Sequence, residues 1–491
     1  MDMSRFVAIF LCFAVPLRGF AEGLPDLGDP SQSMVSPQIE RKIGEEIMRE
    51  IRQYDPLYLD DADVVEYVNS LGYRLVSNSP DARQDFEFFV VKDQTLNAFA
   101  MPGGFIGVHT GLIVSSQSES ELASVLAHEI GHVVQRHIAR QIGQQAQTTL
   151  PLLAAMMIAI LAMRSNAQIG QAAIIGAQAA SIQLQLNYSR EFEREADRIG
   201  LQTLGSSGFD VHAMPTFFER LQRNTRVYEN NAPTYLRTHP VTSERIADIE
   251  NRIQNVAFRQ APGSLEFNLV RAKLRAEQGS AEDVITYFTK ELRDKTYANL
   301  VVPHYGMARA YLRMRNIPAA QREVDTVRAL AAASKDIRSP MLENLAGQVR
   351  LAAGDLAGAL AIFSDALTTA YPHSKALIYA YGETLLTAKR SSDAGVFING
   401  QLQLYPRDEK LYDLQARIYE AQGKRLAHHR AAGELLVLRG NLAAAVEQYQ
   451  LAQKSGDGDF FEQSGVDARL RELRRMRADE LKDQKLSRGG P

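Results

Sequence analysis

Residues 121–137 contain two histidines and a glutamate that together could bind and use a metal ion. The segment reads ELASVLAHEIGHVVQRH, in which His128 and His132 are four residues apart. At this spacing on a helix both imidazoles leave the same face, close enough to bind one metal ion. Zinc favours such ligands, and a catalytic zinc site typically has three protein ligands and one open position. Glu129 lies about 100° further round the helix. From there it can act as a general base toward a water at the metal.

The motif helix itself does not supply the third metal ligand. In one common arrangement a third histidine follows six residues after the second, with a glycine midway, but here those positions hold Ile138 and Gln135. His137 follows His132 by five residues, which is about 140° of helix rotation, so it cannot join the same metal ion. We interpret His137 as a surface residue or as one in the layer behind the ligands.

A later predicted helix, residues 188–204, offers carboxylates as the third ligand. Its sequence, YSREFEREADRIGLQTL, places Glu193 and Asp197 four residues apart on one face. In this interpretation Glu193 binds the metal ion and Asp197 hydrogen-bonds a ligating histidine. Glu191 and Glu195 have the same spacing, so spacing alone does not choose between the pairs. In the alternative, all four acids are solvated and pair with arginines of the same helix. These arginines are Arg190, Arg194 and Arg198.

The elements before the motif are predicted to be two helices and a small sheet. Isoleucines recur every four residues across 37–54, and 60–77 carries a similar apolar stripe, which indicates two amphipathic helices. Residues 86–91 read as a strand, and 97–109 as two strands around a Pro-Gly-Gly turn. In residues 118–121 a serine precedes a glutamate by three positions, which predicts a capping box at the start of the motif helix. These elements together indicate an α+β catalytic domain.

The sequence beyond residue 263 is helical and repetitive. Turn segments centred on residues 279, 316, 354, 388 and 423 are 37, 38, 34 and 35 residues apart. This spacing is close to the tetratricopeptide period of 34 residues. Segments 356–367 and 442–452 carry the small and aromatic residues expected of a second repeat helix. Such arrays form superhelices with a concave groove. An irregular all-α domain is the alternative.

The first residues have the features of a cleaved secretory signal. Arg5 precedes the apolar run 6–17, and Gly19-Phe20-Ala21 is a suitable cleavage site. The apolar run is shorter than the roughly 20 residues that a spanning helix needs. We therefore predict a signal peptide over 1–21 and a linker over 22–36, with a retained membrane anchor as the alternative.

Composition narrows the class of protein further. A chain of 491 residues is long enough for two or three domains. Its formal net charge of −3 gives no basis for nucleic acid as the main partner. The single cysteine, Cys12, lies in the predicted signal, so the mature chain would have no disulfide. The apolar segment 150–163 is predicted either to cover the site or to make a peripheral membrane or partner contact.

The pairing of HEIGH with the later EREAD resembles the HtpX-like and CAAX-prenyl-protease-like gluzincins, which share HExxH followed by ExxxD. Residues 97–113, NAFAMPGGFIGVHTGLI, are also similar to the strand pair before the metal helix in that family. The resemblance implies a mostly helical α+β zincin-like metalloprotease domain with a small sheet over 37–256. An all-α tetratricopeptide-repeat superhelix would follow over 263–485.

The same resemblance implies roles for individual residues. It selects Glu193 as third ligand of one Zn²⁺ per subunit, with Asp197 behind a histidine. In the family a histidine after the EAD helix can occupy the open metal position and hold the enzyme inactive. His239, in the sequence Thr-His-Pro-Val, matches that residue. The alternative for His239 is a loop histidine that caps the predicted helix 243–253.

Together with the signal and the repeats, the resemblance points to the periplasmic members of the family. It implies a zinc metalloendopeptidase with a chaperone-like role, which degrades misassembled outer-membrane β-barrel proteins and assists assembly of others. The repeats would dock on the barrel assembly machinery. The alternative is a repeat-based chaperone or adaptor whose zinc site is largely latent.

Two further features of substrate binding are expected from the residues themselves. We expect Ile106, Gly107 and Val108 to form an edge strand to which an extended substrate adds through backbone hydrogen bonds. The oxyanion of the transition state also needs a donor. The candidates for that donor are His239, Arg190 and Arg194.

Overall fold

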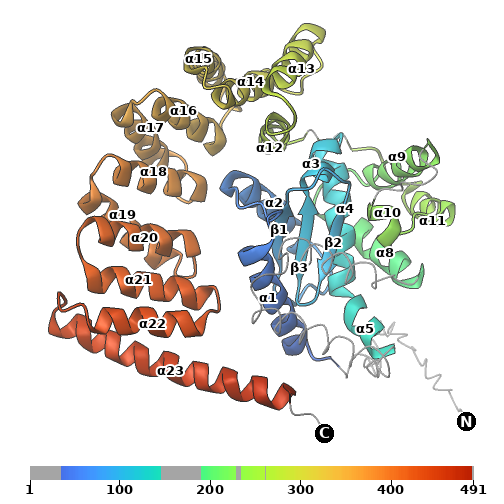
Figure 1. Cartoon of the computed structure of the whole chain (residues 1–491). Helices are drawn as coiled ribbons and strands as arrows, with labels where there is room; N and C mark the ends of the chain where they lie inside the picture. The colour runs from blue at the N-terminus through green and yellow to red at the C-terminus, as the bar shows by residue number, and fades with distance from the viewer. Residues whose placement is uncertain (1–34, 145–189, 228–233, 260, 262, 489–491) are drawn as a thin grey trace, which may run out of the picture.

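The computed structural model describes residues 35–144, 190–227, 234–259, 261 and 263–488. In this part of the chain a domain with a small sheet lies beside a helical array that bends around it (Figure 1). The predicted signal peptide, nearly all of the predicted linker and the apolar segment 150–163 lie outside the described residues. None of the described helices combines the length and the apolar character that crossing a bilayer requires.

Two helices open the first domain, at the positions that the apolar periodicity predicts. They are α1 (Pro37–Tyr54) and α2 (Ala62–Val76). Ser36 and Asp61 cap them, because each side chain accepts a hydrogen bond from a backbone N–H of the first helical turn. Their buried faces pack on the sheet, with Val68 of α2 fully buried in the main core.

The three strands are also confirmed, and their order explains how they pack. They are β1 (Glu87–Val91), β2 (Ala98–Met101) and β3 (Phe105–His109). The β2–β3 hairpin turns through Gly103 and Gly104, whose φ angles of +80° and +84° favour glycine. The sheet order is β1-β3-β2, with β3 parallel to β1 and antiparallel to β2.

The expectation that Ile106, Gly107 and Val108 form an edge strand is wrong. These residues lie in β3, which is the central strand and pairs with neighbours on both sides. Their apolar side chains are fully buried, and a β-carbon on Gly107 would lie 2.5 Å from the ring of Phe99. The outer side of β1 is partly covered, since Tyr58 forms a bridge with Val91. Among the described residues, β2 has a strand partner on one side only.

Six further helices in the described residues complete the first domain. The motif helix is the most deeply buried of them: only its last residue, Val134, is not in the buried class. The helices are α3 (Thr110–Ser115), α4 (Glu119–Val134), α5 (His137–Gln144), α8 (Arg190–Ser206), α9 (Ala213–Val227) and α11 (Ser243–Ile253). A single turn, α10 (Thr234–Thr238), precedes α11.

The capping box at the start of α4 is present with one difference from its usual form. Ser118 is the N-cap, and its hydroxyl accepts a hydrogen bond from the backbone N–H of Glu121 at 3.2 Å. The Glu121 carboxylate returns to the backbone N–H of Gln117, at 2.7 Å, rather than to that of Ser118. Both contacts fix the direction in which the motif helix leaves the sheet.

The second half of the chain is the predicted array of paired helices. The predicted turn segments each contain a residue in the left-handed region: φ is +59° at Gly279, +55° at Arg315, +78° at Gly354, +58° at Lys389 and +71° at Gly423. The helices are α12 (Leu265–Ala276), α13 (Ala281–Asp294), α14 (Val301–Arg313), α15 (Ile317–Ala333), α16 (Pro340–Ala352), α17 (Leu356–Thr369), α18 (Lys375–Thr387), α19 (Ser391–Leu404), α20 (Glu409–Ala421), α21 (Arg425–Leu438), α22 (Leu442–Gln453) and α23 (Phe460–Arg488).

The inner side of the array holds α2 of the first domain (Figure 1). The Nζ of Lys273, on α12, lies 2.6 Å from a carboxylate oxygen of Asp61 and 2.6 Å from one of Asp63. About one turn further along α2, Glu66 accepts a hydrogen bond of 2.6 Å from the backbone N–H of Lys375, the first residue of α18. The groove expected of the repeats is therefore occupied, in part, by a helix of the same chain.

Candidate metal centre

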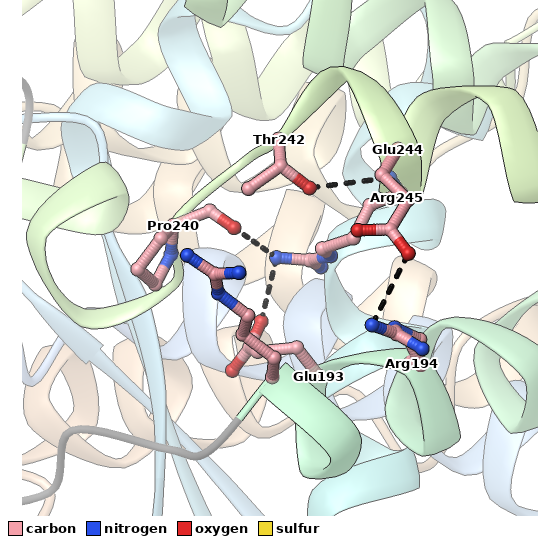
Figure 2. Close-up of a pocket in the computed structure, with 7 residues that line it drawn as sticks. Glu193, Arg194, Pro240, Thr242, Glu244 and Arg245 are labelled. Carbon is pink, nitrogen blue, oxygen red and sulfur yellow. Dashed lines mark hydrogen bonds and ion pairs between the residues drawn. The ribbon is translucent and has the colours of Figure 1, made fainter.

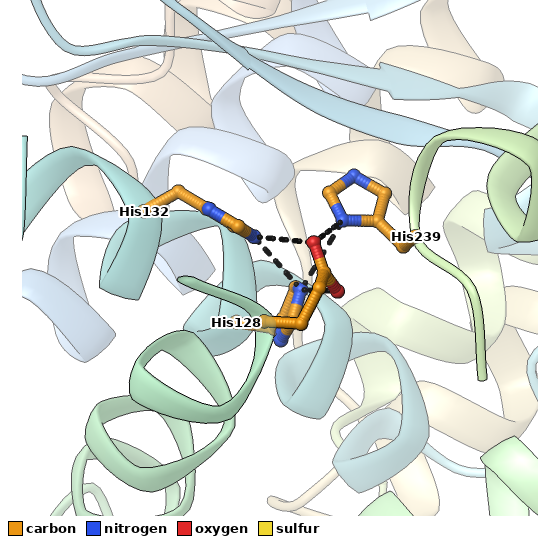
Figure 3. A group of neighbouring side chains, drawn as sticks. His128, His132 and His239 are labelled. Atoms are coloured by element: carbon orange, nitrogen blue, oxygen red, sulfur yellow. Dashed lines mark hydrogen bonds and ion pairs between the residues drawn. The ribbon is translucent and has the colours of Figure 1, made fainter. Parts of the chain in front are cut away.

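Four side chains from three elements converge on one buried point. They come from α4, α8 and the loop after α10, and their ligand atoms all lie within 4.8 Å of one another (Figure 3). The residues are His128, His132, Glu193 and His239. Each side chain is at most 2% exposed. The two motif histidines, the acid selected by the resemblance and the matched loop histidine therefore lie together.

The nitrogens of this cluster face inward. The Nε2 atoms of His128 and His132 are 3.0 Å apart, and each lies 3.5 Å from an oxygen of Glu193. The Nδ1 of His239 lies 3.0 Å from Glu193 Oε1 and 3.4 Å from the Nε2 of His128. Several imidazole nitrogens and a carboxylate around one point form the donor set that zinc prefers.

Close packing of α4 against α8 brings Glu193 to the histidines. Gly131, inside the motif, would place a β-carbon 2.8 Å from the carbonyl oxygen of Ala196. Gly200 makes a similar approach, where a β-carbon would lie 3.0 Å from the backbone nitrogen of His128. Glycine on each helix thus lets the two backbones approach to a distance that side chains would prevent.

Glu129 lies beside the cluster and is fully buried. Among the described residues, no donor makes a hydrogen bond to either of its carboxylate oxygens. The Nε2 of His239 lies 3.5 Å from Glu129 Oε1, within the distance of an ion pair when the imidazole is protonated. A buried carboxylate that lacks donors is free to accept a proton from a group at the metal position.

Asp197 lies behind the first histidine. Its Oδ1 is 2.9 Å from the Nδ1 of His128, the ring nitrogen that points away from the cluster. A carboxylate in this place fixes the ring so that Nε2 carries the lone pair toward a metal. Asp197 is 2% exposed, so the alternative in which it is a solvated helix charge does not hold.

Arg245 is a member of the site that sequence reasoning missed. It makes two hydrogen bonds of 2.7 Å to the Asp197 carboxylate, and its Nη1 lies 2.7 Å from Glu193 Oε2. Its side chain is 3% exposed. A signal was present, because Arg245 lies on the same face of its helix as the buried Ile249. A charged residue on an apolar stripe needs buried partners.

The other acids and arginines of α8 point elsewhere. Glu191 is exposed, and Glu195 contacts α5 rather than the cluster. Arg194 pairs with Glu244 at 3.2 Å, and Arg198 pairs with Asp248 at 3.7 Å. The solvated-charge interpretation therefore describes one face of α8, while Glu193 and Asp197 occupy the buried face.

Electrostatics in the cluster favour positive charge at its centre. Burial alone would lower the pKa of His128, but Asp197 and Glu193 outweigh burial and raise this pKa to about 9. Burial lowers the pKa of His132 well below its usual range. Burial also opposes ionisation of Glu193, yet His239 and Arg245 hold its pKa well below the usual range. An ionised carboxylate facing these imidazoles suits a bound cation.

His239 is held in place by stacking rather than by capping α11. The ring of Tyr235 lies 4.8 Å from it, centroid to centroid, with an angle of 27° between the planes. The N-cap of α11 is Thr242, whose hydroxyl accepts a hydrogen bond from the backbone N–H of Arg245. The capping alternative for His239 is therefore wrong.

A small pocket of ≈ 170 Å³ lies on the outer side of Glu193. Its lining includes Arg190, Arg194, Pro240 and Thr242, the last three of which are labelled in Figure 2. Arg194 is engaged by Glu244 there (Figure 2). Both arginines therefore share the lining of one pocket with Glu193 and Arg245.

Known proteins match both halves of the chain. Residues 63–253 match the model of peptidase family M48, and residues 350–418 match a tetratricopeptide repeat. The putative beta-barrel assembly-enhancing protease of Vibrio cholerae is 38% identical over 320 residues, which is 63% of this chain and 65% of that protein. The beta-barrel assembly-enhancing protease of Yersinia pestis is 30% identical over 466 residues, 94% of each chain.

A similarity to a protein from outside bacteria covers a smaller part of the chain. The mitochondrial metalloendopeptidase OMA1 of Schizosaccharomyces pombe is 32% identical over 185 residues, which is 38% of this chain and 51% of that protein. The match to the Vibrio cholerae protein thus spans somewhat less than two thirds of that protein's length, and the match to the Yersinia pestis protein spans nearly all of it.

Proposed function

The chain belongs to peptidase family M48 and is a metalloprotease, and from this we propose that it is a zinc endopeptidase acting on proteins of the outer membrane. The metallopeptidase domain would span residues 37–256 and the repeat domain residues 263–485. The observation that carries the proposal is the convergence of His128, His132 and Glu193 beside the Glu129 carboxylate, which accepts no hydrogen bond from the described residues.

In this proposal His128, His132 and Glu193 hold one zinc ion. When bound, zinc lowers the pKa of a water toward about 7 and polarises the scissile carbonyl. Asp197 supports the arrangement because its carboxylate lies 2.9 Å from the outer nitrogen of His128. Arg245 contacts both carboxylates and offsets part of their negative charge, so that neither is buried without a cationic partner.

Glu129 is the general base. Both of its oxygens lack hydrogen-bond donors among the described residues, so the carboxylate is available to take a proton. It would accept the proton of the attacking water and return it to the leaving amine. Because it lies within 3.5 Å of His239, a proton could also be shared with that imidazole.

His239 would be a reversible fourth ligand. Its Nδ1 lies among the ligand atoms, where it would take the open position that the attacking water needs. The side chain comes from a loop rather than from α4 or α8, so it can leave without disturbing the other ligands. Once displaced, His239 remains one candidate for the oxyanion donor, with Arg190 and Arg194 as the others.

Substrate would bind as an extended strand on β2. This strand pairs with β3 on one side only, and the outer side of β1 is already bridged by Tyr58. Backbone pairing at such an edge needs little side-chain specificity, which suits unfolded or stalled chains. This assignment replaces residues 106–108 as the substrate-binding edge.

The biological setting follows from the relatives and the N-terminus. Two relatives are named for enhancing β-barrel assembly, which supports a role in assembling outer-membrane proteins and degrading those that misassemble. The signal-like residues 1–21 would direct the chain to the periplasm. The repeats would dock on the assembly machinery.

A chaperone or adaptor role is the second candidate. It is favoured by His239, which lies at the metal position and would keep the site latent. It predicts that a chain without proteolysis still supports barrel assembly, whereas a chain without residues beyond 263 does not. Complementation of an assembly defect by both chains separates the two candidates.

The direct test is Glu129→Gln in the full-length chain. This amide cannot act as a base, so cleavage of an unfolded reporter polypeptide should fall by roughly 10²–10⁴-fold while zinc content stays at one per chain. Glu191→Gln is the matched control, because Glu191 is exposed on α8 and should leave both readings unchanged. Cleavage retained by a zinc-loaded Glu129→Gln protein would contradict the proposal.

A further inference from the structure

We infer that His137 is a positioning residue for the metal ligand His132, and that it links this ligand to the carboxylate of Glu195. The inference rests on the proposed zinc site and adds a contact that the HExxH and ExxxD patterns do not contain. His137 lies five residues after His132, at the start of α5, and its side chain is fully buried.

Two hydrogen-bond distances define the link. The Nδ1 of His132, which points away from the cluster, lies 2.8 Å from the Nδ1 of His137. The Nε2 of His137 lies 3.0 Å from Glu195 Oε2. The three groups form a continuous chain from the ligand cluster to a carboxylate on α8.

The chemistry of the ligand fixes the protons along this chain. A histidine that binds metal through Nε2 carries its proton on Nδ1, so His132 must donate there. The Nδ1 of His137 must then accept, and its proton is placed on Nε2. That proton points at the Glu195 carboxylate, which acts only as an acceptor when it is ionised. One tautomer of each ring satisfies both of these contacts.

The surroundings hold the His137 ring in this orientation. It stacks on Phe192, with ring centroids 4.5 Å apart and planes within 10° of parallel. The guanidinium of Arg140 lies over the same Phe192 ring, 4.6 Å from its centroid, and its Nη1 lies 2.5 Å from Glu195 Oε2. Both the ring and its carboxylate partner are therefore clamped.

The two ligating histidines thus have different partners behind them. His128 contacts the carboxylate of Asp197 directly at 2.9 Å, whereas His132 reaches Glu195 through a second imidazole. Direct contact with a carboxylate strengthens a ligand more than contact with a neutral ring. Glu195, which looked like a duplicate of the Glu193–Asp197 spacing, has this separate use.

The variant test replaces the ring nitrogens but keeps the stacked ring. In full-length His137→Phe, zinc affinity measured by chelator competition should fall by roughly 10–100-fold, the range for loss of such an outer contact. In His137→Asn the amide oxygen can take the place of Nδ1 as acceptor, so affinity should return to within a few-fold of wild type. Glu191→Gln serves as the unaffected control on α8.

A spectroscopic test needs no variant. In the zinc-loaded wild-type chain labelled with ¹⁵N-histidine, His137 should be neutral with its proton on Nε2, and His132 should carry its proton on Nδ1. A proton on His137 Nδ1, or equal zinc affinity in folded wild type and His137→Phe, overturns the inference. Absence of zinc binding by the wild type instead contradicts the proposed function.

Discussion

A β-carbon on Gly131 would lie 2.8 Å from the carbonyl oxygen of Ala196, closer than non-bonded atoms of this kind approach. The contact joins the motif helix α4 to α8 one turn away from the metal cluster. Gly131 occupies one of the two variable positions of the HExxH motif, where the metal chemistry by itself sets no requirement. Its small size is instead what allows Glu193 to reach the histidines.

Gly131→Ala should therefore weaken zinc binding without touching a ligand. The added methyl group would push α8 away and overpack the interface, at a cost of about 1–3 kcal/mol in unfolding free energy. Zinc affinity should fall roughly tenfold or more as Glu193 moves. Chelator competition and thermal unfolding measure the two effects.

The control for this substitution is Gly400→Ala. Gly400 lies within α19, and in the described part of the chain no heavy atom beyond its own stretch of helix lies within 4 Å of its β-carbon position. Alanine there should stabilise the chain by up to about 1 kcal/mol and leave zinc binding unchanged. Unaltered zinc affinity in Gly131→Ala would show that the close approach is not needed for the site.

Arg245→Met should destabilise the metal-free chain strongly. It leaves the buried carboxylates of Glu193 and Asp197 without their guanidinium, and breaking a buried pair costs about 3–5 kcal/mol. Zinc should recover part of this loss, because the ion supplies positive charge next to Glu193. Melting temperatures measured with chelator and with zinc give the destabilisation and its recovery. If the substitution lowers the melting temperature equally in both conditions, zinc and Arg245 do not compensate the same carboxylate charge.

His239→Ala should raise proteolysis severalfold. The substitution removes the side chain that competes with water for the open position, so kcat should increase while zinc content stays constant. His212→Ala is the control, since that histidine pairs with Asp210 at 2.9 Å and is not one of the four cluster residues. Lower activity, or no change, would mean that His239 acts in catalysis or structure rather than as a latch.

Lys273→Met should loosen the attachment of the repeats to α2 in a pH-dependent way. Burial raises the pKa of Asp61, but the charge of Lys273 outweighs burial and lowers it below its usual 3.8. The pair therefore stabilises the fold above pH about 4, and this contribution is lost as pH falls through the lowered pKa. The variant should lose roughly 3–5 kcal/mol at pH 7.

The difference between wild type and Lys273→Met should narrow as the solution becomes acidic, which urea unfolding at pH 7, 4 and 3 would measure. Lys410→Met is the matched control, because its pair with Asp60 is largely exposed and should contribute under about 1 kcal/mol. If the difference in unfolding free energy between wild type and Lys273→Met stays constant with pH, the Asp61–Lys273 pair is excluded as its source.

Much of this arrangement could be predicted from local patterns, because local chemistry determines it. The HExxH spacing places His128 and His132 on one face whatever surrounds them, and the turn at Gly354 requires a residue that tolerates positive φ. The order of the strands, in contrast, could not be predicted from local patterns. Ile106 is apolar in a central strand and in a half-buried edge strand alike, so only the pairing partners distinguish the two.

Contacts between residues that are far apart in the chain could also not be predicted from the sequence. Arg245 is 48 residues from Asp197, and nothing near it in the chain indicates which carboxylates it meets. His137 could be excluded as a ligand from helix geometry, but α5 begins at that residue with a change of direction, since Arg136 has a φ of +52°. That turn is what brings the His137 ring back against His132.

The position of α2 inside the repeats has a consequence for any polypeptide that binds there. A tethered helix acts as an intramolecular competitor, with an effective concentration on the order of millimolar for a short flexible connection. A ligand for the inner face between α12 and α18 would bind the intact chain more weakly than it binds the isolated repeats. By thermodynamic reciprocity, a ligand that displaces α2 weakens the seating of the peptidase domain by the same free energy. Ligand binding to the repeats and attachment of the peptidase domain through α2 are then coupled in a single equilibrium.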